Sequence, residues 1–270
     1  MREPYGRYLR LLGIASIPDC EAGLRLLVRR HVCRVPFENI SKLLLFGREG
    51  AGRFVTLPEF LDGIEQHNFG GTCHSSNPFL AELLREAGYE ADLMGADMSR
   101  PNVHTCIRVR IGSVAYHVDA GYGGPFRVPM RLDRLPHEVI EGSDRYVLDR
   151  RDGGDGYRLS AFSDGQPGQG YLAHDTPRSR EFFRGAMEGS FQPIATFLNN
   201  LRICRIFEEH SVMLFNRTLQ VHRGGKTETR ELNGRDEFAA AIVEELAMPR
   251  CPWEPALKVM ERVTGRPFFG

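Results

Sequence analysis

Long apolar runs, paired cysteines and an excess of charge of one sign are all missing from this sequence of 270 residues. The longest apolar stretches, such as residues 43–46, fall far short of the roughly 20 residues that a membrane-spanning helix needs, so we expect no membrane segment. The six cysteines stand singly with no C-x-x-C pair, which fits neither a disulfide framework nor a zinc ribbon. We therefore expect reduced thiols and no bound metal.

Basic and acidic side chains balance at 35 each, and like charges form no long run. A nucleic-acid or anionic-membrane partner would require a clustered basic face, so neither is expected. Residues 1–4 carry charges with no apolar segment behind them, which argues against a signal or transit peptide. We expect a cytoplasmic protein, a monomer or a weak homo-oligomer, that acts on a small molecule.

Apolar side chains recur at helical spacing through the first ninety residues. The segments with this spacing are residues 5–12, 22–31, 57–66 and 77–88. Gly13 and Gly88 stand where the first and last of these helices would end, and Pro78 stands in the first turn of the last one. Together these segments predict a helical bundle.

From residue 91 the apolar period changes to two, which is typical of strands. Residues 105–111 and 114–119 alternate on either side of Gly112 and Ser113, and this pattern predicts a hairpin. Further alternating runs lie at residues 145–148, 157–160, 212–215 and 218–222. Helical spacing returns at residues 236–248 and 253–264. The order predicts an α+β fold with an antiparallel sheet or barrel in the middle of the chain.

Gly70, Gly71 and Thr72 lead to Cys73, a candidate nucleophile just before the helix that Pro78 is expected to start. The positive end of a helix dipole favours the thiolate at such a position. A cysteine with no partner, however, more often packs in the core. A catalytic role therefore requires a base close to Cys73.

The predicted hairpin offers that base. With a two-residue loop at residues 112–113, His104 and Asp119 lie diagonally on one face, within about 7–8 Å at the backbone. A carboxylate that holds a histidine orients the ring to take a proton from a thiol, as in a Cys-His-Asp triad. Cys73, His104 and Asp119 are therefore the candidate catalytic residues.

Other polar residues near this pair have simpler interpretations. His117 shares a face with Asp119 and is interpreted as a polar residue on the wetter side of its strand. His74 diverges from Cys73 at a helix start, which suits a pocket residue better than a base. The glycine-rich residues 121–125 have backbone amides suited to an anion, although such segments are usually turns. The spacing of these histidines and cysteines matches no known metal site.

Several segments together resemble the arylamine N-acetyltransferases. The matching pieces are residues 8–9 and 12–13, residues 24–26 leading to His31, the Val-Pro-Phe-Glu-Asn-Ile of residues 35–40, the Gly-Gly-x-Cys of residues 70–73 with Asn77, Asn-Val-His at 102–104, and Val-Asp-Ala-Gly-Tyr-Gly-Gly at 118–124. The match runs through residues 5–130 and is thinner beyond them. The Pro-Phe-Glu-Asn and Gly-Gly-x-Cys motifs make the resemblance specific.

The resemblance implies a fold of three units: a helical bundle with a papain-like Cys-His-Asp core at residues 1–90, an antiparallel β-barrel at residues 91–195 and an α/β lid at residues 196–270. It also implies a ping-pong reaction without a metal. Acetyl-coenzyme A, or a related acyl-coenzyme A, would acylate the cysteine, and an arylamine, hydrazine or hydroxylamine would take the acyl group.

The resemblance also implies roles for individual residues. Cys73 would be the nucleophile, His104 the base and Asp119 the carboxylate that orients it. The substrate would contact Val103, Phe37 and His74. Coenzyme A would be approached by Gly121, Tyr122, Gly123 and Gly124.

Two departures from the family pattern lie beside the candidate nucleophile. Phe69 stands where the family usually has arginine, so Glu38 needs another partner, either Arg34 or hydrogen bonds. Residues 74–76 are also more polar than usual. The altered pocket suits an amide synthase of the same family acting on a biosynthetic acyl chain, and Phe69 leaves a non-catalytic binder open. A Cys-His-Asp thiol hydrolase or transglutaminase-like enzyme also stays open, because the triad alone does not choose between water, amine and thiol as acceptor.

Overall fold

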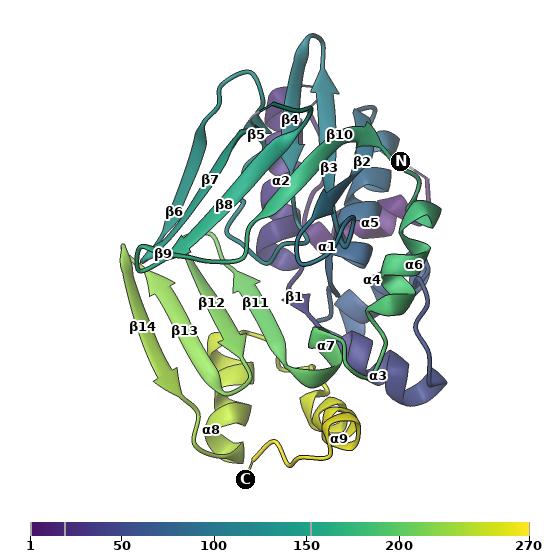
Figure 1. The fold of residues 1–270 in the computed structure, drawn as a ribbon. Helices are drawn as coiled ribbons and strands as arrows, with labels where there is room; N and C mark the ends of the chain where they lie inside the picture. Colours follow the sequence, from purple (N-terminus) through teal and green to yellow (C-terminus); the bar gives the residue numbers. More distant parts are fainter. Residues whose placement is uncertain (1, 19, 152, 270) are drawn as a thin grey trace.

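The computed structural model describes residues 2–18, 20–151 and 153–269, arranged as two antiparallel sheets with helices packed around them (Figure 1). The helices are α1 (Tyr5–Leu12), α2 (Glu21–Arg34), α3 (Ile40–Glu49), α4 (Leu57–His67), α5 (Cys73–Glu86), α6 (Arg184–Gly189), α7 (Thr196–Asn199), α8 (Arg235–Ala240) and α9 (Trp253–Thr264). A 3-10 turn (Arg180–Phe183) precedes α6, and a π-helical turn (Ala241–Glu245) continues α8. No helix within the described ranges is both long enough and apolar enough to span a membrane.

The larger sheet has the strand order β5-β4-β3-β2-β10-β8-β7-β6, and β9 pairs with β8 at its side. Its strands are β2 (Glu90–Asp97), β3 (His104–Ile111), β4 (Val114–Val118), β5 (Met130–Arg131), β6 (His137–Glu141), β7 (Asp144–Arg150), β8 (Tyr157–Ser163), β9 (Gln166–Pro167) and β10 (Tyr171–Pro177). Every pairing is antiparallel, and the sheet curves into a nearly closed barrel. The predicted α+β fold with a central antiparallel barrel is confirmed.

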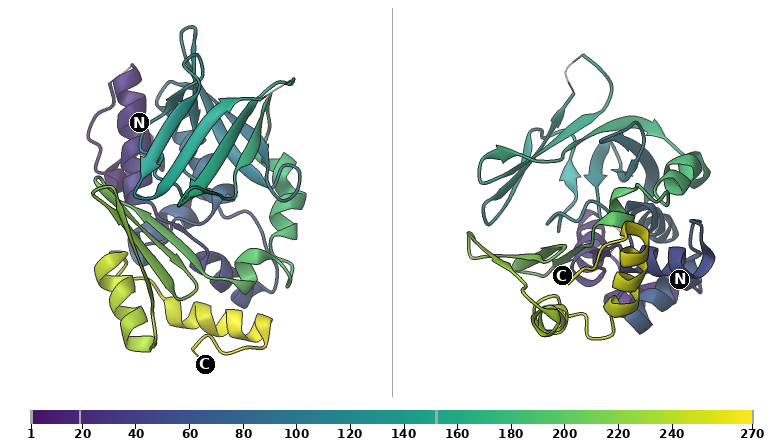
Figure 2. Two further views of the ribbon diagram at one scale, coloured as in Figure 1. Left: turned by 60° about the vertical axis from the view of Figure 1, so that its left-hand side comes forward. Right: turned by 60° about the horizontal axis from the view of Figure 1, so that its bottom comes forward.

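The smaller sheet has the order β1-β11-β12-β13-β14. Its strands are β1 (Phe37–Glu38), β11 (Arg202–Ile206), β12 (His210–Phe215), β13 (Thr218–Arg223) and β14 (Lys226–Glu231). In Figure 1 and in the left view of Figure 2, α8 and α9 lie at the end of the molecule beside this sheet and away from the larger one. Because β1 pairs with β11, the segment that precedes α3 is tied to the C-terminal part of the chain.

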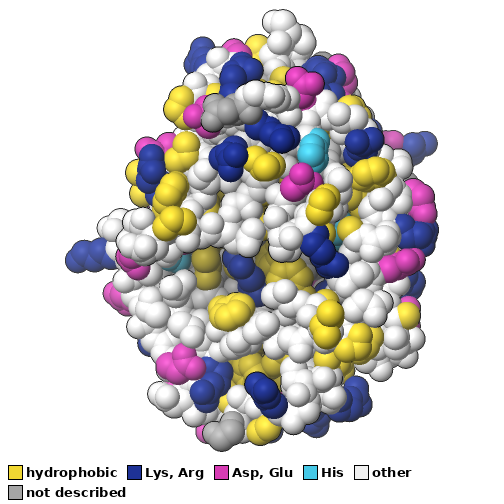
Figure 3. Space-filling view, viewed as in Figure 1, with side chains coloured by type: hydrophobic (Ala, Val, Ile, Leu, Met, Phe, Trp, Pro, Cys, Tyr) yellow, Lys and Arg dark blue, Asp and Glu magenta, His cyan; other side chains and the backbone are white. Residues whose placement is uncertain are grey.

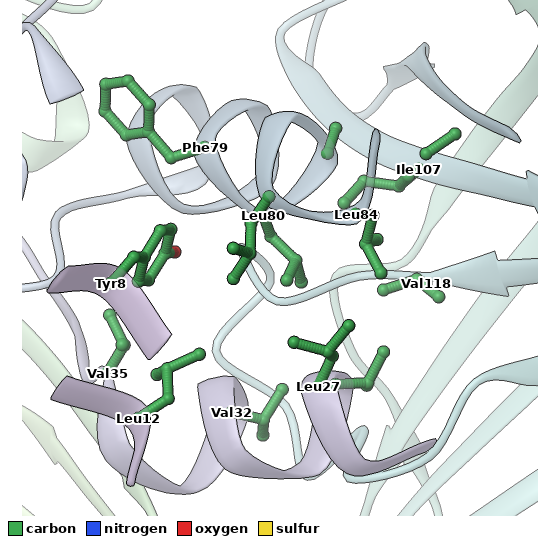
Figure 4. Packing of buried hydrophobic residues seen from close by; sticks show 14 of the residues in the cluster. Tyr8, Leu12, Leu27, Val32, Val35, Phe79, Leu80, Leu84, Ile107 and Val118 are labelled. Carbon is green, nitrogen blue, oxygen red and sulfur yellow. The ribbon is translucent and has the colours of Figure 1, made fainter. Parts of the chain in front are cut away.

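One apolar core joins the first helices to the larger sheet. Leu80 and Leu84 of α5 face α1 and α2 across this core, with Ile107 of β3 and Val118 of β4 at its end (Figure 4). The helical spacing of residues 5–12 and 57–66 predicted α1 and α4 with almost their observed bounds. Gly13 ends α1 in a left-handed conformation, as its position predicts.

A second core lies between the smaller sheet and the helices α3, α8 and α9. Ile40 and Leu43 of α3 are fully buried in it together with Leu214 of β12 and Phe238 of α8. The helix α3 was not predicted from the sequence, because its Leu-Leu-Leu-Phe run at residues 43–46 is apolar around the whole helix and has no clear period. The helix is apolar on several sides because it packs between other elements rather than at the surface.

Candidate active site

The helix α5 begins at Cys73 itself, with Thr72 before it in extended conformation. The amides of Ser75 and Ser76 donate to the Thr72 carbonyl at 2.9 and 3.0 Å, which forms the first turn. The expectation that the helix starts near Pro78 is therefore wrong: this proline lies inside the helix, after its first turn. Cys73 thus stands in the first turn, where backbone N–H groups have no helical acceptor.

The two glycines before Cys73 meet specific local demands. A Cβ atom on Gly70 would lie 1.9 Å from the Pro36 carbonyl oxygen, so only glycine fits there. Gly71 has a φ of 68°, in the left-handed region that other residues rarely adopt. Together they allow the chain to pass closely over residues 35–36 and then turn into α5.

Glu38 holds this turn in place. Its fully buried carboxylate accepts hydrogen bonds from the amides of Gly70 and Gly71, at 3.1 and 2.7 Å. The amide and hydroxyl of Ser41 also donate to it, at 2.8 and 2.7 Å. Of the two partners considered for Glu38, hydrogen bonds and not Arg34 fill the role, so the site does not need the arginine that Phe69 replaces.

His104 and Asp119 form a buried hydrogen-bonded pair. His104 Nε2 lies 2.7 Å from Asp119 Oδ2, and both side chains are almost fully buried. The predicted hairpin register is confirmed up to Val118, the last residue of β4, and Asp119 follows directly. Because Nε2 is used by Asp119, Nδ1 of His104 is the nitrogen left for Cys73.

The charges of this site favour an imidazolium. Burial alone would lower the pKa of His104, but Asp119 and Cys73 outweigh burial and raise it. Burial would likewise raise the pKa of Asp119, but the charge of His104 and the hydrogen bond from Asn77 keep that pKa below its usual value. The pair therefore favours a proton on His104 when the sulfur of Cys73 is a thiolate.

Asn77 was included in the sequence resemblance without a role, and the structure gives it one. Its side-chain amide donates to Asp119 Oδ1 at 2.9 Å and also to the Thr105 carbonyl. Its oxygen accepts from the amide of Ala120 at 2.8 Å. Asn77 lies one turn beyond Cys73 on α5, so it links the helix that carries the thiol to the carboxylate.

His117 does not lie on the wetter side of its strand, contrary to the sequence interpretation. It is 3% exposed, and its Nε2 lies 2.7 Å from the hydroxyl of Tyr171. Burial lowers the pKa of His117 to about 4, so the ring is neutral. Tyr171 also lies against His104, with ring centroids 4.9 Å apart. The face is dry because β10 pairs with β2 and brings Tyr171 over it, a long-range pairing that a local hairpin pattern does not reveal.

His31 is a third buried histidine, and it is linked by hydrogen bonds to the loop after Asp119. The Ser76 hydroxyl donates to the Ala120 carbonyl at 3.0 Å and accepts from His31 Nε2 at 2.7 Å. His31 Nδ1 in turn lies 2.8 Å from the hydroxyl of Tyr8. Burial lowers the pKa of His31 to about 3, which keeps the ring neutral. This chain of bonds connects α1, α2 and α5 to the loop that follows Asp119.

The glycine-rich loop after Asp119 runs directly past the thiol. A Cβ atom on Gly121 would lie 2.5 Å from Cys73 Cα, so the close approach requires glycine. The ring of Tyr122 lies 6.2 Å from that of His104. Gly123 has a φ of 82° and packs against the ring of Phe37. Of the predicted coenzyme residues, Gly121 and Tyr122 therefore lie close to the candidate triad, and Gly123 lies beside Phe37.

Phe37 and Val103, two predicted substrate residues, have different neighbours. Phe37 packs against Phe197, and the guanidinium of Arg202 lies 5.9 Å from its ring. The Val103 carbonyl oxygen is 3.9 Å from Cys73 Sγ. On the side of the molecule that Figure 3 shows, a hollow crosses the middle of the surface and contains hydrophobic and basic side chains. Arg202 was not predicted from the sequence, because only the β1–β11 pairing brings it beside Phe37.

His74 lies beside the thiol but faces a separate small cavity. Its buried ring packs against Phe54 and Phe183, with centroids 6.5 and 6.0 Å away. Burial, followed by the nearby charges of Lys42 and His104, lowers its pKa to about 3. Its Nδ1 has no hydrogen-bond partner. No group of three or more side chains suited to hold a metal occurs in the part of the chain that the structure describes.

Comparisons with known proteins define the family. A family model described as N-acetyltransferase matches residues 22–249. The arylamine N-acetyltransferase of Mycolicibacterium smegmatis is 26% identical over 257 residues, which cover 90% of this chain and 91% of that protein. The chain therefore belongs to the arylamine N-acetyltransferase family and is an acyltransferase enzyme.

Two further relatives are informative. The structure of the Mycobacterium marinum arylamine N-acetyltransferase in complex with CoA has the same fold, with a TM-score of 0.79 at 21% identity over 95% of this chain and 98% of the other. An N-malonyltransferase of Gibberella moniliformis is 33% identical over 119 residues, which cover 37% of this chain and 33% of that protein.

Proposed function

We propose that this enzyme transfers an acetyl group from acetyl-coenzyme A to an arylamine, hydrazine or hydroxylamine through a thioester on Cys73. The observation that carries the proposal is the buried His104–Asp119 pair, joined at 2.7 Å, beside a cysteine in the first turn of α5. The names of the relatives support an arylamine as the acceptor, and one relative was solved in complex with CoA.

In the first half-reaction, His104 Nδ1 takes the proton of the Cys73 thiol. The thiolate attacks the acetyl carbonyl, and a bond forms between sulfur and the acetyl carbon. Backbone N–H groups of the first turn of α5 stabilise the negative oxygen of the tetrahedral intermediate. The bond to the coenzyme A sulfur then breaks, and His104 returns its proton to that leaving thiolate.

In the second half-reaction, the amine attacks the thioester and His104 accepts one of its protons. The amide forms, the carbon–sulfur bond breaks, and Cys73 is regenerated. Asp119 stays ionised throughout, because it holds His104 Nε2–H and so determines which nitrogen faces the thiol. Phe37 and Val103 contact the acceptor, and the loop of Gly121, Tyr122, Gly123 and Gly124 approaches coenzyme A.

Steady-state kinetics with acetyl-coenzyme A and aniline test this function. We expect release of free coenzyme A coupled to formation of N-acetylaniline, with parallel double-reciprocal plots at several acceptor concentrations. Intersecting plots would contradict the thioester route, and coenzyme A release at the same rate without aniline would favour the thiol hydrolase instead. Cys73→Ser serves as the control, because it keeps the side-chain volume and removes the thiol.

A further inference from the structure

A small cavity lies directly beside the candidate nucleophile and is not used by the proposed reaction. Its volume is about 90 Å³, and its lining includes Lys42 of α3, Phe54, Gly71, His74 of α5 and Ser190 after α6. The side chain of Cys73 does not line it, but the residues on either side of Cys73 do. A group bound at the thiol is therefore next to this cavity.

Lys42 is a buried cation in the wall of this cavity. It is 8% exposed, its Nζ donates to Ser190 Oγ at 2.5 Å, and Nζ lies 3.8 Å from the centroid of the Phe191 ring. Burial lowers the pKa of Lys42 to about 7, while the charge of Cys73 acts in the opposite direction. A desolvated ammonium of this kind is costly unless an anion compensates it.

No carboxylate of the described residues pairs with Lys42. Glu59 also lines the cavity, but its oxygens accept hydrogen bonds from Arg53, at 2.6 and 2.9 Å, and from the Thr56 amide at 2.7 Å. Lys42 donates its hydrogen bond to the hydroxyl of Ser190, which carries no charge. The positive charge of Lys42 is therefore left for a ligand.

His74 is a second, independent sign of a ligand. It is buried, and its Nδ1 has no hydrogen-bond partner. The ring also hydrogen-bonds the backbone of Val103, whose carbonyl oxygen lies 3.9 Å from Cys73 Sγ. His74 therefore links the cavity to the thiol. Because the neutral ring uses its one N–H, on Nε2, for the Val103 carbonyl, Nδ1 faces the cavity as an acceptor, and Lys42 is the donor for an anionic oxygen.

We propose that this cavity is a carboxylate subsite, in which a carboxylate on the acyl group or on the amine acceptor lies against Lys42. The inference rests on the proposed acyl transfer and names a substrate class for it. The volume suits this ligand, because about 90 Å³ is several times the space that one water needs and leaves room for a carboxylate end.

Two donors and two acceptors distinguish the possible sources of the carboxylate. Acetyl-coenzyme A is compared with malonyl-coenzyme A, using aniline as the acceptor. Aniline is compared with p-aminobenzoate, using acetyl-coenzyme A as the donor. Each comparison gives a ratio of kcat/KM for the carboxylated substrate to kcat/KM for the neutral one. A ratio separates recognition of the carboxylate from general loss of activity.

The test variant is Lys42→Met, with Lys258→Met on the exposed surface of α9 as the matched control. Loss of a buried charge-assisted hydrogen bond lowers kcat/KM for the substrate that makes it by roughly 10- to 100-fold. We therefore expect one of the two ratios to fall by that factor in Lys42→Met and to stay unchanged in Lys258→Met. A fall in the donor ratio assigns the carboxylate to the acyl group, and a fall in the acceptor ratio assigns it to the amine.

Lys42→Gln covers the case in which Lys42→Met does not fold, because glutamine keeps a hydrogen bond to Ser190 without the charge. If both ratios stay at their unmodified values in the folded variants, the subsite is wrong although the acyl transfer stands. The subsite is also wrong if the unmodified enzyme itself prefers both neutral substrates by more than about tenfold. If no donor and acceptor pair gives an amide, the proposed function itself fails.

Discussion

At the scale of single residues, Asp119 and His117 are neighbours in the candidate site with different hydrogen-bond partners. Both lie close to His104 and Tyr171, but the structure gives them different partners: Asp119 bonds to His104, and His117 bonds to Tyr171. Only Asp119 controls which nitrogen of His104 faces Cys73. The two residues should therefore differ sharply in their effect on catalysis.

We expect Asp119→Asn to lower kcat/KM by about 10³- to 10⁴-fold, because an amide oxygen or nitrogen no longer selects the correct tautomer. His117→Ala should instead cost about 1–3 kcal/mol of stability, because Tyr171 loses a buried partner, with less than about a tenfold loss of activity. Acetylation rates and urea unfolding of both variants check this. A fully active Asp119→Asn enzyme, or an inactive but stable His117→Ala enzyme, would reverse the two roles.

Sequence reasoning could name Cys73, His104 and Asp119 because two of them belong to one hairpin, whose register follows from a two-residue loop. Lys42 and Tyr171 could not be found in the same way. Lys42 lies on α3, a helix without a visible period, and its partner Ser190 is 148 positions away. Long-range contacts of this kind leave no local pattern.

At the scale of elements, the turn before α5 depends on one buried carboxylate. Glu38 is the last residue of β1, and it accepts hydrogen bonds from Gly70, Gly71 and Ser41. It therefore joins β1, α3 and the segment that carries the thiol. The family motif around residue 38 was visible in the sequence. The role of Glu38 as a hydrogen-bond acceptor was not visible, because it depends on where the backbone amides of residues 70–71 point.

Glu38→Gln should lower the free energy of unfolding by about 1–3 kcal/mol. Glutamine has one acceptor oxygen, and its amide NH2 group would face the backbone N–H groups and the Ser41 hydroxyl that donate to Glu38. We also expect a lower kcat, since residues 70–73 lose their anchor. Urea unfolding and steady-state rates measure both effects. Glu49→Gln, on a partly exposed side chain that pairs with Arg48 and Arg53, is the control and should change stability by at most about 1 kcal/mol. Equal stability of the two variants would show that Glu38 is not an anchor.

At the scale of the whole molecule, the three predicted units share cores and strands. Ile40 and Leu43 of the first unit pack among residues of the last, and β1 pairs with β11. The fold class was predictable from alternating periods along the chain. The division at residues 90 and 195 remains a prediction, because periodicity reports the elements and not the contacts between them.

The buried neutral histidines make the whole fold sensitive to acid. Burial lowers the pKa of His31 and His74 to about 3 and that of His117 to about 4, whereas the ordinary value is 6.5. Below pH 6.5 the unfolded chain takes up protons that the folded protein excludes, so stability falls as pH drops from 6.5 towards 4. His104 does not change this trend, because its raised pKa adds stability that is already complete below pH 6.5 and is lost only as pH rises.

Each of the three neutral histidines should lower the free energy of unfolding by about 2 kcal/mol when the pH is changed from 7 to 5. Urea unfolding at the two pH values measures the loss. His31→Gln removes one of the three groups, so this variant should be less stable at pH 7 but lose about 2 kcal/mol less on acidification. A variant with the same pH dependence as the unmodified protein would show that His31 is not excluded from protonation by the fold.

The thioester on Cys73 can be observed in the intact mass of the protein after brief incubation with acetyl-coenzyme A and no acceptor. We predict one added acetyl group on the unmodified enzyme and none on Cys73→Ala. The variant keeps Cys20, which is the exposed thiol among the six cysteines and therefore reports non-specific acetylation. An unchanged mass for the active enzyme, or the same adduct on Cys73→Ala, would contradict a thioester on Cys73 and with it the proposed mechanism.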